Sequence, residues 1–207
     1  MAQLSLLELE STLPLKVWPQ FFGASLADDW LQASLALDWQ TNEIIMFGKT
    51  MPVPRREYFV GDRPEYHYLY SGSVSLFAQP WPEFLQKMKM QIEEATTYSF
   101  PTAMGNLYRD GNDSNGYHAD DEPELGVNPA IASVSLGETR TFRLKPKQKG
   151  GQSIGIELNH GDLVLMQPGC QQDWLHTIPK TKRICGPRVN WTFRPYDESR
   201  ARHLQQC

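Results

Sequence analysis

A histidine and an aspartate lie two residues apart in the sequence, at His118 and Asp120. In an extended chain, alternate side chains point to the same face, so one imidazole and one carboxylate can reach a common metal ion. This spacing alone is weak evidence, because most surface pairs of this kind have no metal role. A metal site requires a third ligand from a distant part of the chain.

Two downstream histidines, His160 and His176, compete for the third position. His160 lies in the segment NHGD, whose composition is that of a turn between strands, where a histidine usually faces solvent. His176 lies among apolar and aromatic neighbours in the segment DWLHTIP. We therefore predict that the catalytic metal ligands are His118, Asp120 and His176. Two histidines and one carboxylate leave positions open on iron(II) for a co-substrate and O2.

The segment RVNWTFR, residues 188–194, alternates polar and large apolar side chains, which places them on opposite faces of a strand. Its polar face comprises Arg188, Asn190, Thr192 and Arg194. Such a face is expected either of a solvent-exposed outer strand or of a barrel strand that lines a polar lumen. An iron site of this type favours the lumen, because 2-oxoglutarate has a carboxylate at each end and guanidinium groups bind carboxylates in bidentate fashion.

The remaining sequence predicts the elements that position these residues. Apolar residues at helical spacing predict a helix over about residues 25–37 and a second one that begins near Pro82. Between them, residues 46–72 are rich in proline, glycine and aromatic side chains, which predicts hairpins and loops. From about Gly105, short β-type runs alternate with turns, which predicts an antiparallel sandwich or barrel. These runs are GNLYR, IASVSLG, TRTFRLK, SIGIEL, DLVLM and RVNWTFR.

Composition places the chain among ordinary globular proteins. Its 207 residues are 40% hydrophobic and 21% charged, and no run approaches the roughly 20 apolar residues that span a bilayer. The opening segment MAQLSLLELE has acidic rather than basic residues, which argues against a secretory signal. An odd number of cysteines without metal-type spacing favours reduced thiols, so we expect a cytoplasmic protein, or a nuclear one in a eukaryote.

The charge balance limits how the protein could bind nucleic acid. A net charge of -4 and a pI near 5.7 count against a protein that holds nucleic acid through charge alone. Any such contact would have to be local.

Five segments, taken in order, resemble the motifs of the AlkB family of nucleic-acid dealkylating dioxygenases. They are NLY at 106–108, HADDE at 118–122, IASVSLG at 131–137, HGD at 160–162 and RVNWTFR at 188–194. The resemblance covers nearly all of the chain from Met46 to Arg194. It implies a mostly β fold with some α structure: a double-stranded β-helix, or jelly roll, with N-terminal helices and a nucleotide-recognition lid.

The same resemblance divides the chain into three parts within one structural domain. Residues 1–40 form an N-terminal extension with a helix, in which we find no family motif. Residues 41–104 form the lid and a supporting helix, and residues 105–207 form the catalytic core.

The resemblance also implies roles for individual residues. His118, Asp120 and His176 are similar to the Fe(II) ligands. Six residues are similar to those that bind 2-oxoglutarate: Asn106, Tyr108, Arg188, Asn190, Thr192 and Arg194. Among these, Arg188 resembles the residue on the distal carboxylate, and Arg194 resembles the arginine near the metal-chelating end.

Five further residues are similar to those that contact the substrate nucleotide: Phe47, Tyr68, Tyr70, Asp121 and Glu122. Tyr70 would stack on a flipped base, and Asp121 and Glu122 would face it. Phe47 resembles a finger that enters the base stack of a duplex, for which packing in the core is the alternative.

The implied function is oxidative demethylation of N-alkylated bases in single- or double-stranded DNA, or in RNA, as part of alkylation-damage repair. The cofactor is Fe(II), with 2-oxoglutarate and O2 as co-substrates, and the products include formaldehyde, succinate and CO2. We expect a monomer without a membrane association. Two alternatives stay open: an Fe(II)/2-oxoglutarate hydroxylase of a small molecule or protein, and a non-catalytic module that binds damaged DNA.

Overall fold

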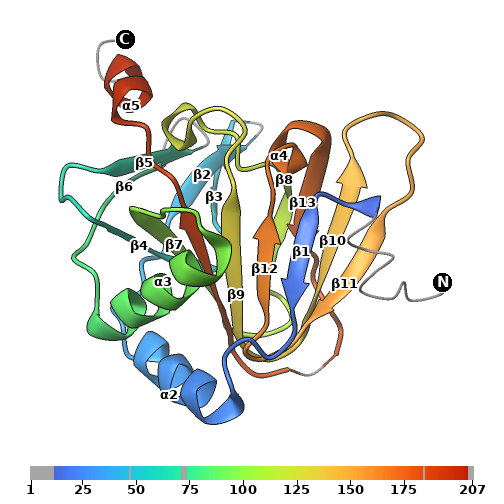
Figure 1. Ribbon diagram of the computed structural model, residues 1–207. Helices are drawn as coiled ribbons and strands as arrows, with labels where there is room; N and C mark the ends of the chain where they lie inside the picture. The colour runs from blue at the N-terminus through green and yellow to red at the C-terminus, as the bar shows by residue number, and fades with distance from the viewer. Residues whose placement is uncertain (1–11, 47, 71–73, 184, 205–207) are drawn as a thin grey trace.

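Two antiparallel β-sheets form the centre of the molecule in the computed structural model (Figure 1). The structure describes residues 12–46, 48–70, 74–183 and 185–204, without the side chains of residues 45, 46, 69, 70, 74, 75 and 202–204. The six-stranded sheet has the order β1-β12-β9-β14-β7-β4, and the four-stranded sheet has the order β11-β10-β13-β8. This arrangement is the predicted jelly roll.

The strands of the two sheets are β1 (Leu15–Trp18), β4 (Arg56–Gly61), β7 (Thr102–Tyr108), β8 (Asn115–His118), β9 (Ile131–Gly137), β10 (Arg140–Pro146), β11 (Ile154–Leu158), β12 (Leu163–Met166), β13 (Trp174–Ile178) and β14 (Arg188–Arg194). Two separate hairpins join β2 (Glu43–Met46) to β3 (Lys49–Pro52) and β5 (His67–Tyr70) to β6 (Val74–Phe77). The helical elements are α2 (Ala24–Leu35), α3 (Glu83–Thr96), η1 (Pro123–Leu125), α4 (Cys170–Asp173) and α5 (Glu198–Leu204).

Apolar side chains from both sheets meet in the space between them. Ile131 and Val164 from the larger sheet and Leu144 and Ile156 from the smaller sheet belong to one buried cluster. Because successive side chains of a strand point to opposite faces, the same strands present other residues to the outer side. The two sheets are therefore held together by a shared core, and the site residues lie beside it.

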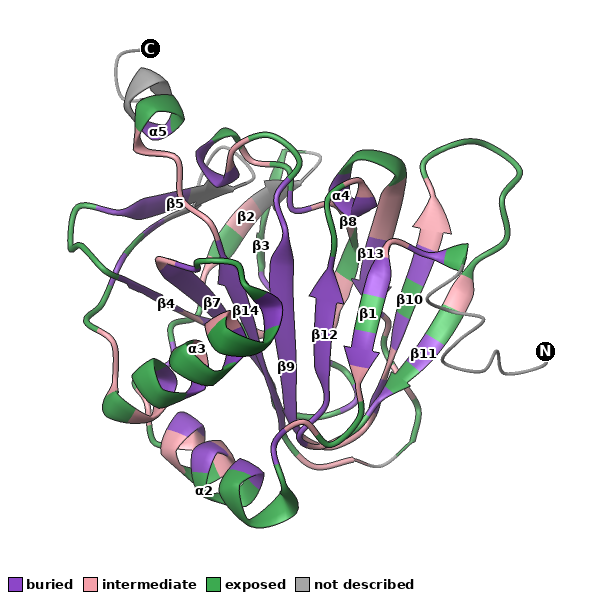
Figure 2. Cartoon of the chain, viewed as in Figure 1, coloured by how far each residue is buried: buried purple, intermediate pink, exposed green. Residues whose placement is uncertain are grey.

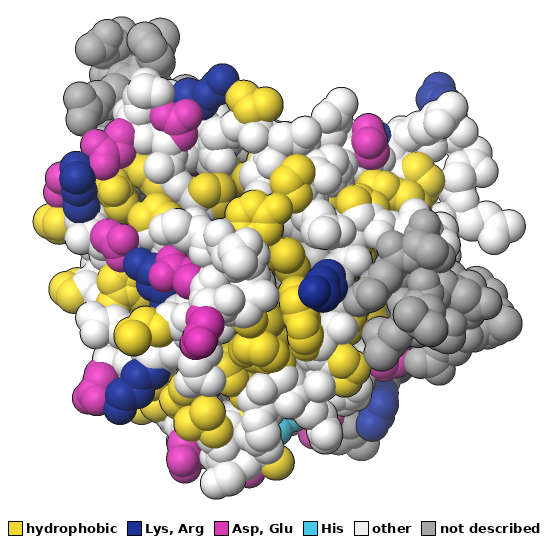
Figure 3. Space-filling view, in the orientation of Figure 1, with side chains coloured by type: hydrophobic (Ala, Val, Ile, Leu, Met, Phe, Trp, Pro, Cys, Tyr) yellow, Lys and Arg dark blue, Asp and Glu magenta, His cyan; other side chains and the backbone are white. Residues whose placement is uncertain are grey.

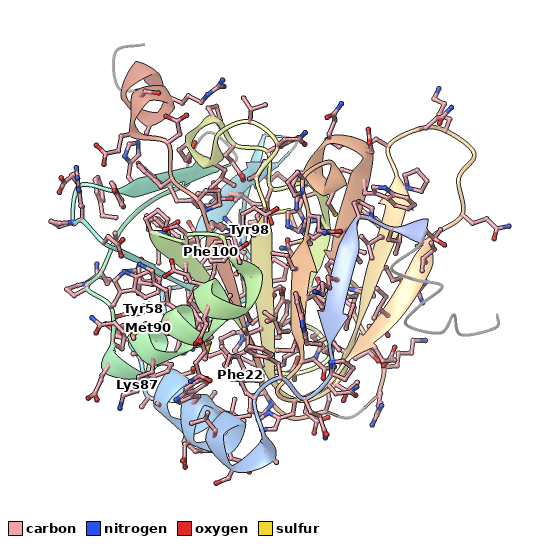
Figure 4. All side chains as sticks on the ribbon, viewed as in Figure 1. Phe22, Tyr58, Lys87, Met90, Tyr98 and Phe100 are labelled. Carbon is pink, nitrogen blue, oxygen red and sulfur yellow. The ribbon has the colours of Figure 1, made fainter. Side chains whose placement is uncertain are left out.

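Helices α2 and α3 cover the outer face of the six-stranded sheet (Figure 1). Trp30 of α2 and Met88 of α3 share a buried cluster with Trp191 of β14, and the indole N–H of Trp191 donates a hydrogen bond to Ser34 Oγ at 3.0 Å. Phe22 and Phe100 belong to the same cluster, whereas Lys87 and Met90 lie on the exposed side of α3 (Figure 4). Both predicted helices are confirmed, with their apolar stripes packed in the core.

The surface on this helical side carries both signs of charge. Acidic and basic side chains alternate over it, without a patch of one sign on the face seen in Figure 3. A basic stripe is the usual mark of a surface that follows a nucleic-acid backbone. Among the described side chains drawn in Figure 3, this face shows no such stripe.

Strand β14 lies in the middle of the larger sheet, between β9 and β7, and all seven of its residues are buried (Figure 2). Val189, Trp191 and Phe193 pack under the helices. The opposite face, which carries both arginines, points between the sheets. The outer-strand alternative for residues 188–194 is therefore wrong.

Strand β1 has no counterpart among the predicted elements. Its four residues pair with β12 and close one edge of the larger sheet, and β4 closes the other edge by pairing with β7. A run as short as LKVW carries too little periodicity to be recognised before its partner strand is known. The larger sheet thus draws strands from residues 1–40, 41–104 and 105–207. Among the described residues, no helix is long and apolar enough to cross a membrane.

Candidate metal centre

Strand pairing brings His118 and His176 together. The two histidines are directly opposite each other on the antiparallel strands β8 and β13, and their ring centroids are 4.2 Å apart. Directly opposed residues on one face of a sheet lie close enough for their side chains to share a ligand. The register of these strands, and not their distance in sequence, determines that this pair forms.

Asp120 completes the cluster from the loop that follows β8. Its Oδ1 lies 3.7 Å from His118 Nε2, and its Oδ2 lies 3.6 Å from His176 Nε2. One ligand atom from each of the three residues lies within 4.8 Å of the others. The structure therefore brings the three predicted metal ligands into a single cluster.

The Asp120 carboxylate is buried and has one oxygen without a hydrogen-bond partner among the described residues, as expected of a metal ligand. The residue is 1% exposed, and its Oδ2 has no hydrogen-bond partner among the described residues. A buried, unsatisfied carboxylate oxygen is costly unless a positive charge offsets it. A divalent metal ion between Oδ2 and the two imidazoles would supply that charge, so the residues present fit the ion.

Protonation states in the cluster suit metal binding. Burial lowers the pKa of His118, and burial together with the neighbouring His118 lowers the pKa of His176 to about 3. Burial by itself would raise the pKa of Asp120, but the positive charge of the neighbouring Arg194 holds it below its usual range. At neutral pH the cluster therefore contains two neutral imidazoles and one carboxylate, the states that coordinate metals.

A backbone contact selects the tautomer of His118. Its Nδ1 lies 2.8 Å from the carbonyl oxygen of Gly116, and a carbonyl can only accept a hydrogen bond, so Nδ1 carries the proton. Nε2 then has the lone pair; it lies 3.7 Å from Asp120 Oδ1 and accepts a hydrogen bond from Asn115 Nδ2 at 3.2 Å, which a metal ion would replace. Most metal-binding histidines are oriented in this way, by a hydrogen bond from the ring N–H that does not face the metal.

Arg194 holds the other oxygen of Asp120. Its Nη2 lies 2.8 Å from Asp120 Oδ1, and both side chains are almost fully buried. The Arg194 guanidinium also lies over the Tyr68 ring, 5.0 Å from its centroid. Because Oδ1 is occupied by Arg194, the carboxylate is oriented with Oδ2 towards His176.

A small pocket adjoins the cluster between the sheets. It is lined by the three predicted metal ligands and by five of the six residues predicted to bind 2-oxoglutarate: Asn106, Tyr108, Asn190, Thr192 and Arg194. The pocket is thus lined by residues from β7 and β14 of the larger sheet and from β8 and β13 of the smaller sheet. The structure brings almost the whole predicted set to one place.

The sixth residue, Arg188, lies beside this pocket and is fully buried. It donates a hydrogen bond from Nη2 to Ser135 Oγ at 2.8 Å and lies 5.3 Å from the centre of the Tyr108 ring. Within the described part of the chain, its Nε and Nη1 have no partner. Burial lowers the pKa of Arg188 to about 10, so it is still a cation at neutral pH. A buried cation with free N–H groups fits a carboxylate ligand.

The polar neighbours of β14 hold the pocket wall in place. Asn190 donates from Nδ2 to Ser133 Oγ and to the Val134 carbonyl, both at 2.8 Å. Thr192 donates to the Met104 carbonyl at 3.0 Å. These bonds tie the central strand to both of its neighbours and leave less capacity for direct contact with a bound molecule.

A larger cavity of about 530 Å³ opens over the metal cluster. Its lining includes His118, Asp120, Tyr68 and Glu122, and the Tyr68 hydroxyl donates a short hydrogen bond to Glu122 Oε1. Burial and the nearby Asp120 carboxylate raise the pKa of Glu122 to about 7, although Arg194 opposes this. The cavity is large enough for a nucleobase and has an acidic group close to the metal cluster.

Asp121 does not reach this cavity. Its side chain is 61% exposed and pairs with Lys147 Nζ at 3.1 Å, and it is absent from the cavity lining. Asp120 and Asp121 are adjacent, and adjacent side chains of an extended segment point in opposite directions. Since Asp120 points inward, Asp121 points to solvent.

Two predicted substrate residues cannot be placed. Phe47 lies outside the described residues, and the side chain of Tyr70 lies outside the description although its backbone belongs to β5. The finger and the stacking contact stay predictions.

Three residues in or beside the large cavity were not predicted from the sequence to bind the metal, the co-substrate or the base. Arg55 lines the large cavity, and its Nε donates to Asn106 Oδ1 at 2.7 Å. Its Nη2 pairs with the buried Glu57 at 2.8 Å, and Asn42 donates to the same carboxylate at 2.8 Å. The one available signal was the alternation of Arg55 and Glu57, which places both on one face of a strand.

Comparisons with known proteins agree with this geometry. Residues 14–194 match the family model described as the 2OG-Fe(II) oxygenase superfamily. The chain is 38% identical over 189 residues to the mouse alpha-ketoglutarate-dependent dioxygenase alkB homolog 3. This alignment covers 86% of this chain and 64% of the mouse protein. It is 36% identical over 184 residues to the human DNA oxidative demethylase ALKBH2, in an alignment that covers 84% of this chain and 70% of the human protein.

The solved structure of OsALKBH1 superposes with a TM-score of 0.61 over 88% of this chain and 98% of that one. Its sequence identity of 17% makes this a likeness of fold. The chain spans somewhat less than two thirds of the mouse relative. The family model names Fe(II) and 2-oxoglutarate, and the His118, Asp120 and His176 cluster has the donor set for that iron.

Proposed function

This chain belongs to the AlkB family within the 2OG-Fe(II) oxygenase superfamily, and on that premise we propose that it oxidatively demethylates N-alkylated bases in DNA. The relatives named above are described as a dioxygenase and as a DNA oxidative demethylase. We further propose that it acts as a monomer on single- or double-stranded DNA, or on RNA, in the cytoplasm or a nucleus.

The observation that carries the proposal is the position of the metal cluster between two differently lined pockets. On one side, the small pocket is lined by Arg194 and lies beside the buried Arg188, whose free N–H groups suit a carboxylate. On the other side lies the larger cavity, which suits the base. His118 and Asp120 line both pockets, so residues that would hold the metal ion adjoin the space for the co-substrate and the space for the base.

The chain's own residues bind and orient the reactants. His118, Asp120 and His176 would hold the iron, and Arg188, with Asn106 and Tyr108, would hold the distal carboxylate of 2-oxoglutarate. Iron(II) with 2-oxoglutarate and O2 supplies the oxidation of an alkyl C–H bond. The protein adds a fixed geometry, which brings one N-alkyl group close to the metal and excludes water. The hydroxylated alkyl group then leaves the base nitrogen as formaldehyde.

The larger cavity suits a cationic base. Methylation at N1 of adenine or N3 of cytosine makes the ring cationic and blocks pairing, which also makes the base easier to flip. Glu122 lines the cavity, where a carboxylate attracts a cation. We therefore propose that 1-methyladenine and 3-methylcytosine are preferred to neutral 1-methylguanine and 3-methylthymine.

The test is formaldehyde release from matched oligonucleotides, in single- and double-stranded DNA and in RNA, each with one of these four lesions. We expect 2-oxoglutarate-dependent release that is fastest for the two cationic lesions. No release from any oligonucleotide, together with 2-oxoglutarate turnover on a small molecule or protein, would favour the hydroxylase alternative. Lesion binding without any turnover would favour the non-catalytic alternative.

A further inference from the structure

Asp120 is the one member of the metal cluster that no strand holds in place. His118 and His176 are opposed on paired strands, but β8 ends at His118 and Asp120 lies in the loop beyond it. A loop residue keeps more conformational freedom than a residue in a ladder. Its position therefore depends on contacts from elsewhere in the fold.

Two contacts supply that position, one to the side chain and one to the backbone. Arg194 holds carboxylate oxygen Oδ1, as described above. The backbone N–H of Asp120 donates a hydrogen bond to Gln171 Oε1 at 2.9 Å. This second bond fixes where the Cα atom lies, which a contact to the carboxylate alone does not do.

Gln171 is itself held firmly. It is 2% exposed, and its Nε2 donates to Met166 Sδ at 3.4 Å. Because the amide nitrogen has the sulfur as its partner, the amide oxygen faces Asp120. The orientation of the side-chain amide is thus determined by two different partners.

Gln171 also links two separate parts of the cluster. It lies in α4, and α4 leads directly into β13, which carries His176. A single side chain therefore connects the segment that precedes one ligand to the backbone of another. Movement of α4 and of the Asp120 loop is coupled through this hydrogen bond.

We propose that Gln171 is a positioning residue for the metal centre, which sets the distance of Asp120 from the two histidines through the Asp120 backbone. The inference rests on the proposed iron site. Residues that orient metal ligands typically change metal affinity by about 10- to 100-fold when they are replaced.

The experiment measures Mn²⁺ affinity, by electron paramagnetic resonance of free Mn²⁺, in the full chain without DNA. Gln171→Met removes the acceptor and keeps an unbranched side chain. We expect its Kd for Mn²⁺ to rise by about 10- to 100-fold. The matched control is Gln172→Met, because Gln172 is adjacent and exposed, and its Kd should stay within about twofold of the wild type.

Stability separates a positioning role from a merely structural one. Urea unfolding of the metal-free variants reports the structural contribution of Gln171. If Gln171→Met lowers the urea midpoint but binds Mn²⁺ as tightly as the wild type, the inference is wrong. Gln171→Glu keeps an oxygen acceptor at the same position, so it should bind Mn²⁺ at least tenfold more tightly than Gln171→Met.

If Gln171→Met does not fold, Gln171→Asn serves in its place. Its shorter side chain withdraws the oxygen from the Asp120 N–H, and the same rise in Kd is expected. An Mn²⁺ affinity of Gln171→Asn equal to that of the wild type overturns the inference. Failure of the wild-type protein to bind Mn²⁺ is a different outcome, since it would overturn the proposed iron site itself.

Discussion

Arg194 and Asp120 form an ion pair that is almost completely buried, with 2.8 Å between Nη2 and Oδ1. The pair leaves the other carboxylate oxygen free beside His176, at 3.6 Å from Nε2. An arginine on the central strand thus determines which oxygen is available to a metal ion. The same ion pair contributes to the stability of the metal-free protein, because Arg194 then offsets the buried charge of Asp120.

Replacing Arg194 by methionine should destabilise the metal-free protein by about 3 to 5 kcal/mol, because the Asp120 carboxylate would be left buried without its partner. Urea unfolding in the presence of a chelator measures this loss. The double variant Arg194→Met/Asp120→Asn, which has neither charge, should lose less than the sum of the two single variants. Strict additivity would show that the pair contributes nothing specific.

His176→Ala should abolish both Mn²⁺ binding and formaldehyde release, because two ligands cannot hold the ion as three do. His160→Ala is the matched control. His160 accepts a hydrogen bond from the Gly137 backbone N–H at 2.8 Å and has Asp28 nearby at 3.3 Å, so its loss affects stability but not the metal. Equal loss of Mn²⁺ binding in both variants would contradict the assignment of the third ligand.

Arg188→Met should raise the KM for 2-oxoglutarate by about 10- to 100-fold, because a charge-assisted hydrogen bond is worth about 1.5 to 3 kcal/mol. Steady-state turnover at varied 2-oxoglutarate measures this change. Metal affinity without 2-oxoglutarate should be unchanged, since Arg188 is not among the metal cluster. An unaltered KM would remove Arg188 from the co-substrate site.

Glu122→Gln should slow demethylation of the cationic lesions 1-methyladenine and 3-methylcytosine and leave the neutral lesions nearly unaffected. Glu122 lines the cavity over the metal cluster, and with its pKa raised to about 7 it is partly ionised at neutral pH. A cationic base in the cavity favours the carboxylate form, so replacement by the uncharged amide weakens the attraction for a cation. Rates on four matched oligonucleotides provide the measurement.

Asp121→Asn is the control for that experiment. Its carboxylate is largely exposed and paired with Lys147, so the preference for cationic lesions should persist. A comparable loss of preference in Asp121→Asn would mean that bulk surface charge, and not the cavity, selects the lesion.

Local sequence determined much of this protein. The two helices followed from apolar residues at helical spacing, and the two faces of β14 followed from the alternation in RVNWTFR. These patterns depend only on the geometry of a single element, since a helix or strand fixes which side chains share a face. The candidate ligand pair His118 and Asp120 was visible for the same reason, because the two residues are only two positions apart.

Tertiary structure decided what those patterns could not. Whether the arginine face of β14 met solvent or a lumen depended on its neighbours β9 and β7, which lie far away in sequence. The short segment β1 is a strand because it pairs with β12. The opposition of His118 and His176 arose from strand register, and the placement of Arg55 and Gln171 arose from contacts across the fold. Register and long-range hydrogen bonds join residues without a fixed sequence spacing, so only the folded chain specifies them.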